Sequence, residues 1–220
     1  MFTLCWSVKG GVGTTVVASA LALVSARVTP TVLIDLGGDA PAALGIAEPS
    51  GPGVFDWLAS PNAPGPALLH LGARVVEGLH VVRTGDPAMV EQLDDAGWHR
   101  LARASSDGSV AVVIDAATMQ VPALIHEQAA HSLLVIRPCY LALRRAAGSG
   151  GLASGVVLVS EPGRALGTHD VQRALATPVL AEIAWDPAIA RSIDAGLLSA
   201  RLPNGLVRPL RRLCVDAAAA

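Results

Sequence analysis

The stretch that decides the fold lies near the start of the chain and reads Ser7-Val8-Lys9-Gly10-Gly11-Val12-Gly13-Thr14-Thr15. An apolar run, residues 2–8, leads into it, and an alanine-rich apolar segment, residues 16–26, follows it. This order predicts a strand, a glycine loop and a helix, which is the setting in which such a loop binds phosphate. Glycines let successive backbone N–H groups point into one concavity, and the helix N-terminus adds a partial positive charge.

One lysine lies inside this loop. The chain has 16 Lys and Arg residues, and Lys9 is its single lysine. A compact ammonium fits against phosphate oxygens more readily than a planar guanidinium in so tight a loop. The use of lysine here, in a chain that otherwise uses arginine, therefore supports the phosphate-binding interpretation.

The same N-terminal segment has a rival interpretation as a secretory signal peptide. Lys9 is followed by an uncharged run, and Val24-Ser25-Ala26 resembles a small-residue cleavage site. The apolar segment before Lys9 and the glycines and threonines after it favour the glycine loop instead. No later stretch reaches the roughly 20 apolar residues that a membrane-spanning helix needs.

Composition favours a single α/β domain over residues 1–220. Apolar residues make up 52% of the chain and aromatic residues 3%, so we expect a core of Ala, Val and Leu, which suits parallel strands covered by helices. A net charge of −2 gives no general attraction to nucleic acid or to anionic lipid. The cysteines are odd in number and far apart (Cys5, Cys139 and Cys214), which argues for a reducing compartment, the cytoplasm, and against a disulfide framework.

Short apolar runs alternate with helical segments along the chain. The runs expected as strands are 31–34, 79–83, 110–114, 133–136, 156–159 and 179–183. A Pro/Gly-rich stretch, 41–66, encloses a short helix at 54–59, and Pro87 is expected to open a helix that reaches about residue 105. Strands that alternate with helices predict a doubly wound, mostly parallel sheet flanked by helices.

Two aspartates each end one of the expected strands. Asp35 and Asp115 would then lie at the carboxyl edge of the sheet, where the glycine loop also lies. A carboxylate there can hold a Mg²⁺-bound water, while Thr15 offers its hydroxyl to the metal. A strand-end aspartate taken singly is more often a helix cap or a turn residue. The two aspartates together with the loop favour nucleotide binding.

These residues resemble a known family. Lys9 to Thr15 resembles the deviant Walker A motif (KGGxGK[ST]) of the ParA/MinD P-loop ATPases, 32–35 falls where their switch I segment lies, and 112–115 resembles their Walker B strand. The resemblance implies ATP and Mg²⁺ as ligands and an ATP-dependent homodimer in which Lys9 reaches the partner's phosphates. The loop residues implied to bind the nucleotide are Lys9, Gly10, Gly11, Val12, Gly13, Thr14, Thr15 and Val16, and those implied to hold the metal are Thr15, Asp35 and Asp115.

Two departures from the family pattern concern catalysis. The second lysine of the motif, which grips the β- and γ-phosphates, is Thr14 here. The second aspartate of switch I, which helps to place the attacking water, is Gly37, and Asp39 comes two residues too late. Each loss removes a contribution commonly worth a factor of roughly 100 or more. We therefore expect very slow hydrolysis or none, with Lys9, Asp35 and Asp39 as the candidate catalytic residues.

The missing lysine is similar to the TadZ/CpaE branch of the family, whose members localise the Tad (Flp) pilus machinery at a cell pole. The resemblance implies a polar or membrane-proximal position and a partner such as a secretion or pilus ATPase. The receiver-like domain that many of those proteins carry before the loop is not expected here, because the loop begins at residue 9. The alternatives are a partition ATPase of the ParA type, a septum-site regulator of the MinD type, and a scaffold that uses the fold without nucleotide.

Three further segments bear on partners and ligands. Leu206, Leu210 and Leu213 share a helical face near the C-terminus, which fits a helix packed on the sheet better than a membrane-binding helix. Arg144-Arg145 and Arg211-Arg212 are the paired basic residues, so DNA binding is not favoured but stays open. The relatives contact adenine at places that correspond here to Ser160-Glu161-Pro162 and Trp185-Asp186-Pro187. Pro162, Asp186 and Pro187 are therefore candidate adenine contacts, although turn chemistry alone would also explain the prolines.

Overall fold

The computed structural model describes residues 1–108, 110–149 and 151–216. Its strands are β1 (Phe2–Trp6), β2 (Thr31–Asp35), β3 (Ala73–Val76), β4 (Leu79–Val82), β5 (Ala111–Ala117), β6 (His131–Ile136), β7 (Gly155–Ser160) and β8 (Val179–Ala184). Its helices are α1 (Thr14–Ser25), α2 (Ala40–Leu44), α3 (Val54–Leu58), α4 (Gly65–His70), α5 (Asp95–Ala104), α6 (Ala123–Gln128), α7 (Tyr140–Ala147), α8 (Thr168–Leu175), α9 (Pro187–Asp194) and α10 (Asn204–Asp216), with a 3-10 helix η1 (Pro87–Gln92).

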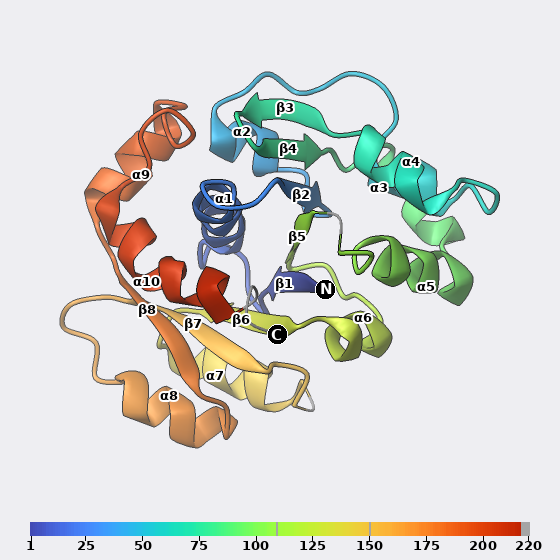
Figure 1. The fold of residues 1–220 in the computed structure, drawn as a ribbon. Coiled ribbons are helices and arrows are strands. Elements are labelled where there is room, and N and C mark those ends of the chain that lie inside the picture. Colours follow the sequence, from blue (N-terminus) through green and yellow to red (C-terminus); the bar gives the residue numbers. More distant parts are fainter. Residues whose placement is uncertain (109, 150, 217–220) are drawn as a thin grey trace.

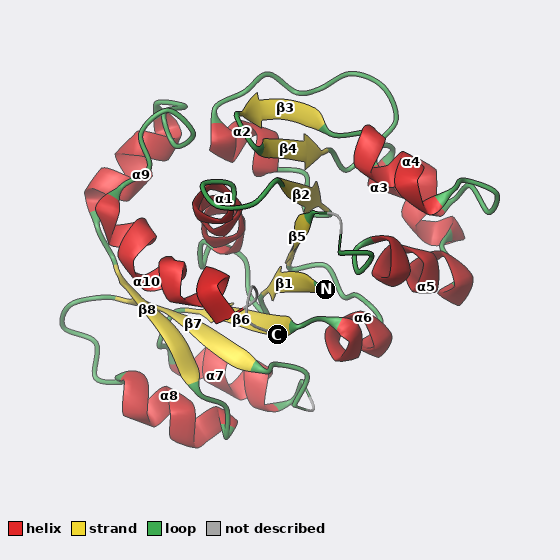
Figure 2. Ribbon diagram, in the orientation of Figure 1, coloured by secondary structure: helices red, strands yellow, loops and turns green. Residues whose placement is uncertain are grey.

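The strands form one sheet in the order β3-β4-β2-β5-β1-β6-β7-β8 (Figure 1). All neighbouring strands in this order are parallel except β3, which is antiparallel to β4. Helices lie on both sides of the strands, with α1 and α10 on one side and α5 to α8 on the other (Figure 2). The predicted doubly wound, mostly parallel α/β sheet is confirmed.

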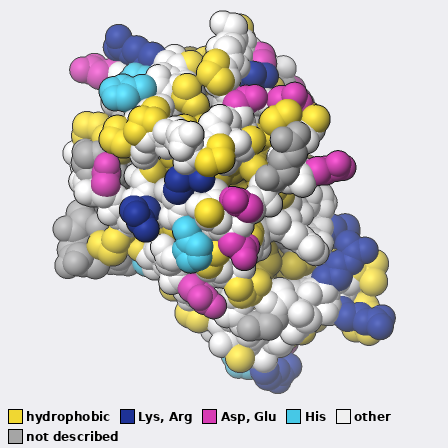
Figure 3. All heavy atoms as spheres, turned by 90° about the vertical axis from the view of Figure 1, so that its right-hand side faces the viewer, with side chains coloured by type: hydrophobic (Ala, Val, Ile, Leu, Met, Phe, Trp, Pro, Cys, Tyr) yellow, Lys and Arg dark blue, Asp and Glu magenta, His cyan; other side chains and the backbone are white. Residues whose placement is uncertain are grey.

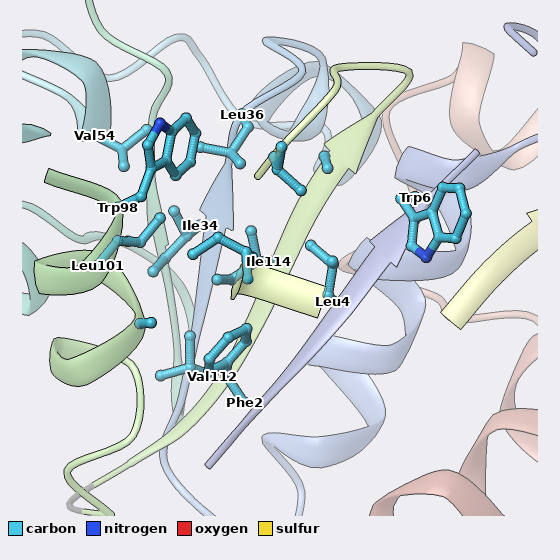
Figure 4. Packing of buried hydrophobic residues seen from close by; sticks show 14 of the residues in the cluster. Phe2, Leu4, Trp6, Ile34, Leu36, Val54, Trp98, Leu101, Val112 and Ile114 are labelled. Carbon is cyan, nitrogen blue, oxygen red and sulfur yellow. The ribbon is translucent and has the colours of Figure 1, made fainter. Parts of the chain in front are cut away.

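Each face of the sheet has its own hydrophobic core. One core joins the strands to α3, α5, α6 and α7, and the other joins them to α1, α9 and α10. On the first face, Ile34 and Ile114 come from adjacent strands and point with Leu4 to the side where Trp98 and Leu101 of α5 lie (Figure 4). Because both faces are covered, strand residues of both parities are apolar, as expected for buried parallel strands.

The first 25 residues supply the centre of the fold. β1 lies between β5 and β6, and its five residues are all buried. Most residues of α1 are buried as well, against α10 and β5. A cleaved signal peptide would remove this central strand and helix, so the fold favours the glycine-loop interpretation of this segment.

Two local expectations were wrong. The helix expected from Pro87 to about residue 105 is divided into η1 and α5. The division occurs because Asp94 caps α5 by accepting a hydrogen bond from the backbone N–H of Gly97 (2.7 Å), and a capping residue has non-helical backbone angles. The antiparallel strand β3 was not expected at all, and its residues are only partly buried or exposed at the edge of the sheet.

The C-terminal helix packs on the sheet through its leucines. Leu206, Leu210 and Leu213 of α10 are buried in the same core as α1 and β8. Their apolar face is therefore occupied by the protein itself. Within residues 1–108, 110–149 and 151–216, no helix is long and apolar enough to cross a bilayer. The alanines at 217–220 lie outside the described residues.

Replacing Leu210 by alanine tests this packing. Leu210 is fully buried, so Leu210→Ala should lower the free energy of unfolding by about 2–5 kcal/mol, as core truncations do. The matched control is Leu197→Ala, because Leu197 is 49% exposed; it should cost less than about 0.5 kcal/mol. Chemical denaturation measures both. Equal stability of the two variants would show that α10 does not pack as described.

Candidate functional site

The glycine loop connects β1 to α1 at the carboxyl edge of the sheet. Gly11 (φ +74°) and Gly13 (φ +96°) have left-handed backbone conformations, which glycine adopts without strain. A Cβ atom at Gly10, Gly11 or Gly13 would meet nothing within 4 Å, so the loop backbone faces open space. No side chain caps α1 and its first turn has no acidic residue. The N–H groups at the start of α1 are thus free for an anion.

The start of the loop is tied to the end of β5. The backbone N–H of Ser7 donates to the carbonyl oxygen of Ala117 (2.8 Å), and the Ser7 hydroxyl lies 3.0 Å from the same oxygen. Ala117 has a positive φ of 48°, which is uncommon for a residue with a Cβ. Its own N–H donates to Oδ1 of Asp115 (3.0 Å). A short chain of hydrogen bonds therefore links the loop to the strand-end carboxylate.

Asp35 and Asp115 lie side by side, as predicted. They face each other in the register of β2 and β5, and both are fully buried. Asp35 Oδ1 accepts from the N–H groups of Gly37 (2.9 Å) and Gly38 (2.8 Å), and Oδ2 accepts from Ala40 (3.0 Å). Burial raises the pKa of Asp35 and these three hydrogen bonds lower it. Asp35 therefore shapes the turn that follows β2, the alternative role of a strand-end aspartate.

Asp115 is bonded differently. Its Oδ2 atom is buried and has no hydrogen-bond partner among the described residues. Burial raises the pKa of Asp115 to about 7; a hydrogen bond with the Thr15 hydroxyl lowers it in part, and the charge of Asp35 raises it. A buried oxygen without a partner is costly, so it marks a position where a bound group can donate. Asp115 and Thr15 are the pair that the structure brings together below the loop.

Gly37 stands where a carboxylate would not fit. A Cβ at Gly37 would lie 2.7 Å from the Cβ of Ala117, closer than real Cβ contacts. The backbone of this chain therefore leaves no room for an acidic side chain at this position of switch I. Asp39 is exposed, and its carboxylate does not cap α2. Its charge still raises the pKa of Asp35 and of Asp115, so it lies near both.

The two positions of the lysine motif differ in exposure. Lys9 is exposed, and no ion pair to it is formed within the described parts of the chain. Thr14 is 5% exposed at the first position of α1. The cation of this loop thus points outward, and the inner position is neutral.

A cavity lies beside the loop, between α1, the ends of β6 to β8, and α9. It is lined by Val12, Gly13, Val16, Val17, Arg137, Val159, Ile183, Ala184, Trp185, Asp186, Ile189, Ala190, Ile193 and Leu206. Of the predicted nucleotide residues, Val12, Gly13, Val16 and Asp186 therefore lie together. Trp185, which belongs to the segment predicted to contact adenine, lines the cavity next to Asp186. Its side chain is 42% exposed.

Two predicted base-contacting residues lie elsewhere. Pro162 lines a separate hollow with Leu158, Ser160 and Thr168, beside α8. This placement follows from strand alternation, because Leu158 and Ser160 point away from α1 while Val159 points towards it. Pro187 is the first residue of α9 and does not line the cavity. Asp186 caps that helix by accepting a hydrogen bond from the Ala188 N–H (2.8 Å). Pro187 therefore occupies the first position of the helix, which proline favours.

A magnesium ion fits this arrangement only together with a phosphate ligand. The described residues contain no group of three or more His, Cys, Asp or Glu side chains that could hold a metal by themselves. Mg²⁺ characteristically keeps several waters and binds through one or two protein oxygens plus substrate phosphates. Thr15, the orphaned oxygen of Asp115 and the open loop supply this kind of donor set.

Comparison with known proteins shows the fold. No protein-family model and no curated protein matches the sequence. Among solved structures, a ParA family ATPase from Chlorobium tepidum has a TM-score of 0.79 at 14% identity, with 97% of this chain and 98% of that chain covered. The septum site-determining protein MinD from Pyrococcus horikoshii, complexed with Mg-ADP, has a TM-score of 0.74 at 22% identity, with coverages of 100% and 98%. The chain has the ParA/MinD ATPase fold.

A third similar structure adds a second ligand state. A variant of McdA from Cyanothece in complex with ATP has a TM-score of 0.70 at 16% identity, covering 100% of this chain and 96% of that chain. The ParA/MinD fold of the present chain thus spans nearly the whole length of each of these proteins. At such identities the likeness establishes the architecture, and the roles of individual residues have to be argued from this chain.

The buried Asp115 predicts a pH dependence of stability in metal-free buffer. Its pKa is raised from 3.8 to about 7, so between these values the folded chain binds more protons than the unfolded chain. The free energy of unfolding should therefore fall as the pH rises towards and through 7, by at most about 1.4 kcal/mol per pH unit for one proton. Asp115→Asn should flatten this slope in urea denaturation between about pH 5 and 8.

The control for this prediction is Asp194→Asn, which removes an exposed carboxylate from α9. It should keep the wild-type slope. A slope that is unchanged in Asp115→Asn would contradict the burial of an uncompensated carboxyl group at the end of β5.

Proposed function

We propose that this chain binds Mg-ATP at the glycine loop, forms a nucleotide-dependent homodimer, and acts as a positioning factor with little or no hydrolysis. The observation that carries the proposal is the orphaned Oδ2 of Asp115, buried beside Thr15 below a loop whose backbone faces open space. A structural aspartate would be expected to use both oxygens, as Asp35 does.

Each part of the site then has a role. The N–H groups of residues 10–15 surround the phosphates, and the Thr15 hydroxyl and a water on Asp115 hold the magnesium ion, which neutralises phosphate charge. Asp35 keeps the following turn in place and remains a metal candidate through water. The apolar cavity lined by Val16 and Trp185 receives the base.

Slow hydrolysis follows from what the site lacks. Phosphoryl transfer depends on positioning and on electrostatic stabilisation. Thr14 supplies no charge at the inner lysine position, and Gly37 cannot be replaced by an acid without displacing Ala117. Asp39 is the acid that remains near the pair, and it is exposed. We therefore assign Asp39 at most a weak role in placing the attacking water.

Dimerisation is proposed from Lys9. Its ammonium is exposed and unpaired within the described residues, at the mouth of the loop. If a second subunit docked against this edge, the Lys9 ammonium of one subunit would lie close to the phosphates bound by the other. ATP would then act as a switch between monomer and dimer, and a partner protein would bind one of the two states.

The partner that we favour is a machinery component such as a secretion or pilus ATPase, as for TadZ/CpaE-like proteins in the cytoplasm near a pole or membrane. A partition role would require a basic DNA-binding surface. The exposed pairs Arg144-Arg145 and Arg211-Arg212 lie on α7 and α10, on opposite sides of the sheet. On the face over α4 to α6, charges of both signs are interspersed (Figure 3). ATP-dependent, salt-sensitive retention of DNA would favour partition.

Thermal unfolding with and without Mg-ATP tests the binding proposal. A ligand that binds the folded chain stabilises it by about 2.7 kcal/mol at 100 times its dissociation constant. We expect the melting temperature to rise with Mg-ATP, and the extra stabilisation by Mg²⁺ over ATP alone to be lost in Asp115→Asn. Asp194→Asn should behave as wild type. No shift at millimolar Mg-ATP would favour the nucleotide-independent scaffold.

Single-turnover hydrolysis tests the proposed loss of catalysis. With enzyme in excess over radiolabelled ATP, ADP should form so slowly that Asp39→Ala changes the rate less than about twofold, because no positioned acid is left to lose. Rapid turnover that disappears in Asp39→Ala would overturn this part of the proposal and would make Asp39 the water-positioning residue.

A further inference from the structure

An arginine lies at the level of the glycine loop, one strand away. In the register of β1 and β6, Trp6 is paired with Leu134. The glycine loop follows Trp6, the last residue of β1, and Arg137 follows Ile136, the last residue of β6, so both leave the sheet at the same carboxyl edge. Arg137 therefore comes to the edge of the site from a segment distant in sequence.

The side chain of Arg137 points to the face on which α1 begins. Leu133 and Val135 belong to the core on the α1 side, and alternation along the strand sends Arg137 to the same side. It accordingly lines the cavity with Val12 and Gly13 of the loop. Among the residues that line this cavity, it is the one cation.

A carboxylate holds this arginine in place. Arg137 Nη1 donates to Oε1 of Glu161 (3.1 Å), and the Nε of Arg164 donates to Oε2 of the same carboxylate (2.6 Å). Two guanidinium groups share one carboxylate, so the group keeps a net charge of +1. The Nε atom of Arg137 is buried and has no hydrogen-bond partner among the described residues. The guanidinium of Arg137 therefore has N–H donors that Glu161 does not use.

We propose that Arg137 binds the phosphates of the nucleotide and supplies, from β6 of the same subunit, the positive charge that Thr14 does not supply. The inference rests on the proposed nucleotide binding. A guanidinium presents several donors in a fixed fork that matches phosphate oxygens. Glu161 is then a positioning residue, which orients Arg137 without contacting the ligand.

Arg137 would also set the specificity of the site. The cavity wall is otherwise mostly apolar and suits a base, and it does not depend on Arg137 for that contact. Arg137 therefore makes the site favour nucleoside di- and triphosphates over the nucleoside. Lys9, which is exposed, contributes to the dimer rather than to the affinity of a single subunit.

Calorimetric titration of the full chain with adenosine, ADP and ATP in Mg²⁺ tests the proposal. Arg137→Gln should weaken ADP and ATP binding about 10- to 100-fold, the effect of one or two charge-assisted hydrogen bonds, and change adenosine binding less than about twofold. Arg137→Lys, which keeps a charge without the fork, should fall between. The matched control is Arg173→Gln, which removes an exposed arginine paired with Asp170 on α8 and should change nothing.

A rescue experiment separates charge supply from a structural role. Thr14→Lys, added to Arg137→Gln, should restore ADP binding at least about tenfold, because it returns a cation to the loop itself. Far-UV circular dichroism and melting confirm that each variant is folded. Equal losses for adenosine and ADP in Arg137→Gln, or no loss at all, would overturn the assignment while leaving nucleotide binding intact. A wild-type chain that binds none of the three ligands would refute the proposed function instead.

Discussion

The burial of two carboxyl groups side by side is the constraint around which this site is arranged. Asp35 and Asp115 are both fully buried at the ends of neighbouring parallel strands, where desolvation and mutual repulsion disfavour charge on either. Three backbone N–H groups offset this cost at Asp35, but one oxygen of Asp115 has no donor within the described residues. The two aspartates therefore differ in role. Asp35 holds the turn that follows β2, whereas Asp115 has one buried oxygen without a hydrogen-bond partner among the described residues.

The backbone around this pair leaves no room for an acidic side chain at position 37. Ala117 adopts a left-handed conformation so that it can bond both Ser7 and Asp115. Its Cβ then occupies the space beside Gly37 and excludes a side chain there. The loop, the strand end and the switch turn are thus one hydrogen-bonded unit. An acid at position 37 and the present geometry of position 117 exclude each other.

Much of this fold could be predicted because buried parallel strands are apolar on both faces and stand out between turns. The apolar runs of β5 and β6, for example, are recognisable as strands from their own residues, without knowing which strands pair with them. β3 could not be found in this way, because it is an antiparallel edge strand with few buried residues. The break before α5 depends on which of several polar residues caps the helix. The hydrogen bond from the Gly97 N–H identifies Asp94 as that residue, and the sequence alone does not.

The site was predictable in outline but not in its details. The order of loop, Asp35 and Asp115 predicted that these residues would lie at one edge of the sheet, and the register of β2 and β5 brings the two aspartates together there. From the sequence the two aspartates are equivalent, because only the structure shows which of them has hydrogen-bond partners for both carboxylate oxygens. Arg137 was missed because it is a single residue after a strand, and the direction of its side chain depends on the alternation along that strand. The same alternation puts Pro162 beside a separate hollow.

A crystal structure of the chain with Mg²⁺ and a non-hydrolysable ATP analogue tests the central claim most directly. The account predicts the triphosphate over residues 10–15, Mg²⁺ about 2.1 Å from the Thr15 hydroxyl oxygen, and a metal-bound water that donates to Oδ2 of Asp115. Asp35 should keep its three backbone hydrogen bonds. A structure in which Oδ2 of Asp115 stays without a partner, or in which the nucleotide lies away from the loop, would contradict the account.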